Sequence, residues 1–119
     1  MEMCEEMKKL RDWLMKHRIE YKDDSTIASH EFISKSIELG VPENMADTSV
    51  FRTKFEIDDV YYSVIYGYCT YGGNDPVTGD EKLLEMKCSA VNNCVPQGWL
   101  RASDIISFIK IYHGYREDD

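Results

Sequence analysis

The sequence predicts one domain of the α+β class. We expect an antiparallel meander of three to four strands, with two N-terminal helices and a C-terminal helix packed on one face. Apolar and polar residues alternate through the middle of the chain, and helical periodicity precedes and follows this stretch. A length of 119 residues suits a single domain, here residues 1–119, and 43% apolar residues are enough for a core.

The first and last helices are predicted from their apolar stripes. In residues 2–17, apolar side chains such as Met7 and Leu10 recur at steps of three and four, so they share one face. Residues 102–113 carry a second stripe of this kind, and Gly114 is a natural residue at which that helix ends. Both helices are therefore expected to pack on the sheet.

A further helix is predicted at residues 29–39. Gly40 follows it directly and suits the left-handed conformation that ends many helices. We expect this helix to turn Phe32, Ile33 and Ile37 inward, because they are its most apolar positions. It would then be the second N-terminal helix on the covered face of the sheet.

The strands are predicted from period-two alternation and from turn residues. Between residues 50 and 57, apolar side chains alternate with charged ones, as in a half-buried strand. Asp58 and Asp59 suit a two-residue turn into a second strand rich in β-branched and aromatic residues. The predicted strands are a short edge strand at 19–22 and the meander strands at 50–57, 60–68 and 83–90.

The charge of the chain favours some partners over others. Its formal charge is −8, from 22 acidic and 14 basic residues. Such a chain repels phosphate backbones, which argues against direct nucleic-acid binding. It suits an acidic surface that docks on a basic protein, the alternative being simple solubility. No apolar run approaches 18 residues, so we expect no membrane contact. The acidic N-terminus lacks signal-peptide features, so a cytoplasmic location is expected.

No cofactor, metal or catalytic motif is predicted. Cys69, Cys88, Cys94 and His113 lack the paired spacing of a zinc site. A disulfide between Cys69 and Cys88 is conceivable, but free thiols are the default in a cytoplasmic protein. The histidines stand far apart and none lies in a nucleophile motif, so the chain is not expected to be an enzyme. A thiol-based enzyme using Cys69 or Cys94 is the remaining alternative.

Two loops at the ends of predicted strands carry side chains suited to binding. Residues 66–74 hold three tyrosines beside glycines, which offer aromatic faces and hydroxyls at little entropic cost. The alternative interpretation is a twisted strand end whose glycines permit a bulge. Residues 92–99 offer amides, and Trp99 either stacks on a ligand or anchors the last helix to the sheet.

Arg52 adds a cation to these candidates. It shares the polar face of its strand with Lys54. The two either pair with Glu85 and Lys87 across the sheet or contact a phosphate or an acidic ligand. The candidate partner- or ligand-binding residues are Arg52, Tyr66, Tyr68, Tyr71, Asn74, Asn92, Asn93 and Trp99.

Five short stretches from residue 52 onward form a recognisable spacing pattern. They are Arg52-Thr53-x-Phe55, Ser63-Val64-Ile65-x-Gly67, Thr70-Tyr71-Gly72-Gly73, Leu83-Leu84-Glu85, and Gly98-Trp99-Leu100 leading into a helix. The pattern resembles small uncharacterised proteins encoded by phages and mobile elements of Gram-positive bacteria. The resemblance carries no catalytic motif and no residue roles. It implies an antagonist of host defence that acts in the cytoplasm of a bacterial host.

Three functional hypotheses follow. The first is a non-enzymatic, anti-CRISPR-like inhibitor whose acidic surface docks on a basic nucleic-acid-handling protein such as a CRISPR effector. The second is an oligomeric sponge that binds and sequesters a nucleotide immune signal. The third is a small thiol-dependent enzyme. The first and second are binding proteins without cofactors, with a host defence protein or a nucleotide as the partner.

Overall fold

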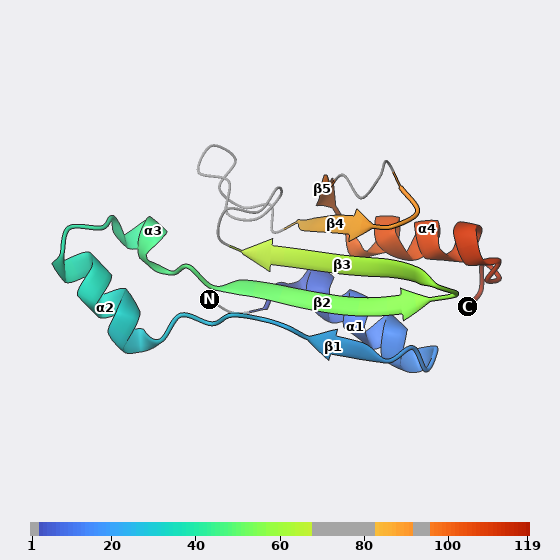
Figure 1. Cartoon of the computed structure of the whole chain (residues 1–119), viewed down its shortest axis with the longest axis horizontal. Helices are drawn as coiled ribbons and strands as arrows, with labels where there is room; N and C mark the ends of the chain where they lie inside the picture. Colours follow the sequence, from blue (N-terminus) through green and yellow to red (C-terminus); the bar gives the residue numbers. More distant parts are fainter. Residues whose placement is uncertain (1–2, 68–82, 92–95) are drawn as a thin grey trace.

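The chain forms a five-stranded antiparallel sheet with helices on one face (Figure 1). This computed structural model describes residues 3–67, 83–91 and 96–119. The strands lie side by side in the order in which they occur in the sequence. The elements are α1 (Glu5–Lys16), β1 (Tyr21–Asp23), α2 (His30–Glu38), α3 (Glu43–Ala46), β2 (Val50–Ile57), β3 (Val60–Gly67), β4 (Leu84–Cys88), β5 (Gln97–Leu100) and α4 (Ala102–His113).

The hydrophobic core lies between the sheet and the helices α1 and α4, which lie behind the strands in Figure 1. Leu10 and Leu14 of α1 and Ile109 of α4 are fully buried. On the sheet, the rings of Phe55 and Tyr62 stack at 4.7 Å between centroids. The helical stripes predicted for α1 and α4 are therefore confirmed as core faces. No helix among the described residues is long and apolar enough to cross a membrane.

The predicted hairpin is confirmed, and its turn has the expected chemistry. Ile57 pairs with Val60 at the end of the β2–β3 ladder. Asp58 and Asp59 both have positive φ, at 49° and 66°. Two successive left-handed residues are what a type I′ turn requires, and Asp tolerates that conformation better than most residues.

The sheet has one strand more than the prediction. Residues 97–100, which the sequence analysis placed in or after a loop, form β5 at the edge of the sheet. This strand is short, its register with β4 shifts between Leu84 and Met86, and Trp99 has a φ of 61°. Such an irregular strand shows no period-two pattern. Trp99 is 50% exposed, so it does not anchor α4; Leu100 packs against the core instead.

The prediction that α2 packs on the sheet is wrong. No residue of α2 is buried, and it packs mainly against the single turn α3, beyond the end of the sheet (Figure 1). We call residues 27–47 the arm. The arm makes the molecule long: its extents are 51 × 26 × 26 Å, and its radius of gyration is 15.6 Å. A compact domain of this length would have about 13.5 Å.

The two ends of the arm are fixed to each other at the edge of the sheet. Thr26 and Val50 exchange two backbone hydrogen bonds of 2.8 Å. Ser49, which lies between the end of the arm and Val50, has a fully buried side chain. The Ser49 hydroxyl accepts a hydrogen bond from the Ala28 amide at 2.9 Å and donates one to the Asp47 carboxylate at 2.6 Å. One side chain thus joins the outgoing and returning segments.

We expect Ser49→Ala to loosen this junction. The substitution removes one hydrogen bond from each segment, and a lost buried hydrogen bond costs about 1–2 kcal/mol. Urea unfolding should show that loss, and amide hydrogen exchange at Ala28 should quicken. Ser36→Ala is the matched control, because the Ser36 hydroxyl bonds only within α2, to the Phe32 carbonyl. Equal effects of the two substitutions would contradict this role for Ser49.

Candidate functional site

The structure separates the residues that the sequence analysis grouped as a binding site. Tyr66 is 1% exposed and lies in the core, so its side chain presents no surface to a ligand. Arg52 lies on the face of the sheet opposite the core, whereas Trp99 lies on β5, with β3 and β4 between them. Tyr68, Tyr71, Asn74, Asn92 and Asn93 lie outside the described residues.

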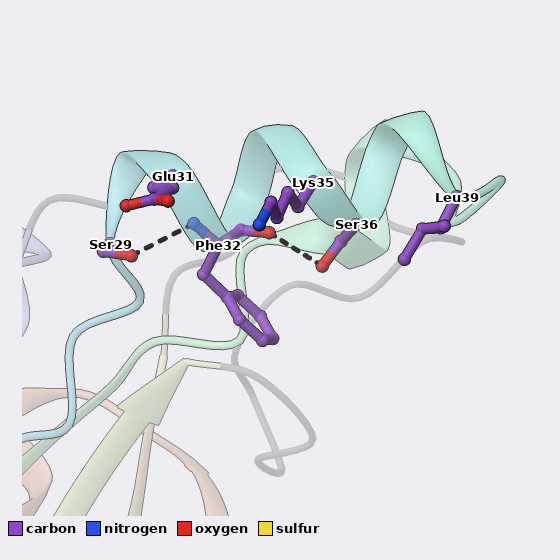
Figure 2. A pocket seen from close by; sticks show the side chains of 6 residues that line it. All are labelled: Ser29, Glu31, Phe32, Lys35, Ser36 and Leu39. Carbon is purple, nitrogen blue, oxygen red and sulfur yellow. Dashed lines mark hydrogen bonds between the residues drawn. The ribbon is translucent and has the colours of Figure 1, made fainter.

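The arm presents the most apolar exposed surface of the described chain. Leu39 is 86% exposed and Phe32 is 50% exposed. They occupy positions i+7 and i of one helical face, with Ser36 between them at i+4. Figure 2 shows all three side chains pointing to the same side of α2. The exposed large apolar residues of the arm are Ile27, Phe32, Ile37, Leu39, Val41 and Met45.

Both ends of helix α2 are capped by hydrogen bonds with residues of the helix or directly beside it in the sequence. The Ser29 hydroxyl accepts a hydrogen bond from the Phe32 amide at 3.0 Å, as an N-cap does (Figure 2). At the other end Gly40 has a φ of 98°. Its amide bonds the Ile37 carbonyl at 3.0 Å, and the Val41 amide bonds the Ser36 carbonyl at 2.9 Å. This pair of bonds is a complete Schellman motif, so both ends of the helix are satisfied without the sheet.

The exposed face of the arm is unusual for so short a helix. A nine-residue helix is marginally stable alone, and most helices gain their stability by burying an apolar face. Here that face stays in solvent. Contiguous exposed apolar surface on a soluble protein commonly marks an interaction site. The arm also carries four carboxylates and one lysine, so its charge has the same sign as that of the whole chain.

Asp58, His113 and Tyr62 form a chain that is similar in outline to a catalytic relay. The His113 ring lies 2.7 Å from the Tyr62 hydroxyl and 3.3 Å from an Asp58 carboxylate oxygen. Tyr62 is fully buried, and burial raises the pKa of its hydroxyl. A hydroxyl inside the core reaches no substrate, so this chain of contacts fixes the β2–β3 turn to α4.

The described cysteines are buried thiols. Cys4 and Cys88 are both free, so the conceivable disulfide from Cys88 is absent; Cys69 itself lies outside the described residues, as does Cys94. Burial raises the pKa of the Cys4 thiol, which lowers its reactivity. Within the part of the chain that the structure describes, no group of three metal-ligating side chains comes together.

The sequence carried a signal for the arm that the prediction misinterpreted. Phe32, Ile33, Ile37 and Leu39 spread over an arc of about 160° on α2, wider than the roughly 100° of a single stripe, and apolar residues continue past its end to Val41 and Met45. A helix that packs on a sheet from one side needs only one stripe.

Comparison with known proteins finds no matching family model, no matching curated protein and no matching solved structure.

Proposed function

We propose that the protein is a non-enzymatic binding protein that docks its arm into an apolar groove on a basic protein. Following the sequence resemblance, the partner is a nucleic-acid-handling protein of a bacterial defence system, such as a CRISPR effector, in the cytoplasm of the host. The observation that carries the proposal is an amphipathic helix with no buried residue, whose two ends are satisfied by its own caps.

Recognition of an amphipathic helix by a groove follows a known pattern. Anchors at i, i+4 and i+7 enter the groove, as Phe32, Ser36 and Leu39 would do here. Fully burying a Phe or a Leu contributes about 1.5–3 kcal/mol each. The two anchors therefore supply a large part of the affinity that such an interface needs.

Charge favours a basic partner over a second copy of this chain. A twofold contact between two arms would bring together two surfaces of the same negative sign. A basic surface beside the groove would instead attract the arm and speed the encounter. The complex should therefore weaken as salt is raised, because salt screens exposed charges.

The test uses purified CRISPR effector nucleases of Gram-positive bacteria and measures binding by biolayer interferometry. We expect Leu39→Gln to weaken binding at least tenfold. Ile111→Gln is the matched control, since Ile111 is 84% exposed on α4 and the charge is unchanged. It should bind like the wild type. Failure of the wild type to bind any effector of the panel, or equal binding by Leu39→Gln, would reject the proposal.

Sedimentation of the free protein tests the competing occupant of the arm. The proposal expects a monomer at micromolar concentration. A dimer that Leu39→Gln abolishes would assign the arm to a second copy of the chain. Circular dichroism of each variant confirms that loss of binding is not loss of fold.

A further inference from the structure

We propose that the face of the sheet on which no described helix packs binds a small phosphate-bearing ligand of nucleotide size. This face is the one opposite α1 and α4. The binding hollow has a volume of about 470 Å³, within the range of small-molecule sites. Its lining residues are Arg52, Lys54, Tyr61, Ser63, Lys87 and Ser89.

Cations line up across this face although the chain is acidic. Lys22 lies opposite Lys54, Lys54 opposite Ser63, and Ser63 opposite Lys87. Directly opposed like charges destabilise a sheet. Asp24 offsets part of this repulsion, since its carboxylate lies 2.8 Å from the Lys54 ammonium. A bound anion would offset the rest.

Arg52 supplies a second, independent observation. Its Nε atom is buried and has no hydrogen-bond partner in the described structure, although one guanidinium nitrogen lies 3.9 Å from Asp24. A buried donor without an acceptor is rare in a folded protein. The Arg52 side chain is 38% exposed, so a turn of the guanidinium toward the hollow would bring Nε to a bound phosphate oxygen. Arg52 is two residues from Lys54 on the same strand, so it faces the same hollow.

The lining defines the class of ligand. Lys54 and Lys87 are the cross-strand neighbours of Ser63 on its two sides, and all three line the hollow, so together they offer a set of donors suited to one phosphate group. The Tyr61 ring is 47% exposed beside them and offers a face on which a base can stack. A planar base joined to a phosphate therefore matches the hollow better than a bare anion does.

Neighbouring carboxylates restrict the ligand to a small one. Glu56 lies opposite Tyr61, and Glu85 lies opposite Ile65 on the same face. With Asp24 they surround the cations with negative charge. A long polyanion would meet this charge along its length, whereas a compact phosphate would meet mainly the cations and the one Asp24 carboxylate that lies beside Lys54.

Isothermal titration of the full chain with AMP, adenosine and inorganic phosphate tests the site. We expect AMP to bind more tightly than either fragment. Lys87→Gln should weaken AMP binding at least tenfold, while Lys16→Gln, on α1 away from this face, should leave it unchanged. Tyr61→Ala should reduce AMP affinity to that of inorganic phosphate.

Three outcomes would overturn the inference. They are no heat of binding with any probe at millimolar concentration, AMP binding that survives Lys87→Gln, and tighter binding of a single-stranded oligonucleotide than of AMP. The last would assign the face to nucleic acid. Because the arm lies beyond the end of the sheet, Leu39→Gln should not alter AMP binding, so this site and the docking proposal fail separately.

Discussion

Gly67→Ala should destabilise the protein by about 3 kcal/mol or more. Gly67 ends β3 with a φ of +137°, a conformation that costs an L-residue about 1–3 kcal/mol. A Cβ atom there would lie 2.3 Å from the Ser49 carbonyl oxygen and 3.1 Å from the Val50 Cα. Both neighbours are backbone atoms that cannot rotate away, so overpacking adds to the strain. The midpoint of urea unfolding should fall accordingly.

Gly114→Ala is the control that measures the backbone strain of a positive φ without the steric overlap present at Gly67. Gly114 has a φ of +75° but nothing within 4 Å of the added Cβ. It should cost only the strain of a left-handed residue, about 1–2 kcal/mol. Similar losses in the two variants would show that the close approach at Gly67 is unimportant.

The close approach at Gly67 also affects the arm. Gly67 lies opposite Val50, one residue beyond the buried Ser49 that joins the two arm segments. An added methyl group would push that junction away from β3. We therefore expect the Thr26 and Val50 amides, which bond across the junction, to lose protection from hydrogen exchange in Gly67→Ala.

The elements that the sequence predicted well are those with local signals. The β2–β3 hairpin combines strict alternation with two residues that tolerate positive φ. The C-terminal helix has a broad apolar stripe and ends at Gly114, where the prediction placed its end. Helix α2 was also predicted as a helix, from its apolar residues and from Gly40 directly after it; the Ser29 cap was found only in the structure. Its position, however, depends on tertiary contacts that it lacks, and no local pattern reports a missing contact.

The site was predictable only in part, for a similar reason. Arg52 and Lys54 occupy the alternate positions of β2 that point away from the core, so the prediction that they share one face is confirmed. Tyr66 is two residues beyond Val64 and four beyond Tyr62, so the alternation of a strand places all three side chains on the core face. The glycines that follow Tyr66 suggested a loop and obscured that alternation. The row from Lys22 to Lys87 requires the pairing of four strands, which one sequence does not supply.

Arg11 lies on the core face of α1, at i+4 from Met7, and periodicity alone does not reveal which partners satisfy its charge there. Its Nε donates to the Thr53 hydroxyl at 2.7 Å, and a terminal nitrogen donates to the Arg52 carbonyl at 3.3 Å. Another contact reaches Asp23 at 3.2 Å, and the guanidinium carbon lies 5.2 Å from the Tyr21 ring centroid. One buried cation thus ties α1 to β1 and β2.

Arg11→Met should destabilise the fold by about 2 kcal/mol. Met keeps much of the apolar packing, but it leaves the buried Thr53 hydroxyl without its donor, which costs about 1–3 kcal/mol. The Arg52 carbonyl keeps its hydrogen bond from the Asp24 amide at 3.0 Å. Adding Thr53→Val should recover part of the loss, because an apolar pair no longer needs a donor. Lys9→Met, on the exposed side of α1, is the control and should be near neutral. A double variant less stable than Arg11→Met would contradict the pairing.

The difference in free energy of unfolding between the wild type and Arg11→Met should become smaller in acid. Hydrogen bonds from Ser25 and then from Arg11 lower the pKa of Asp23 in the folded state. A lowered carboxyl pKa contributes stability above the unfolded value, about 4, and loses it as the pH falls further. Because the Asp23 side chain is 54% exposed, solvent screens the pair and the pH effect should be the smaller part of the total. Urea unfolding of both proteins from pH 7 downward measures it. If this difference in free energy of unfolding grew in acid, the Arg11–Asp23 pair would not stabilise the fold. The contacts of Arg11 with Thr53 and Arg52 would then account for the entire loss of stability in Arg11→Met.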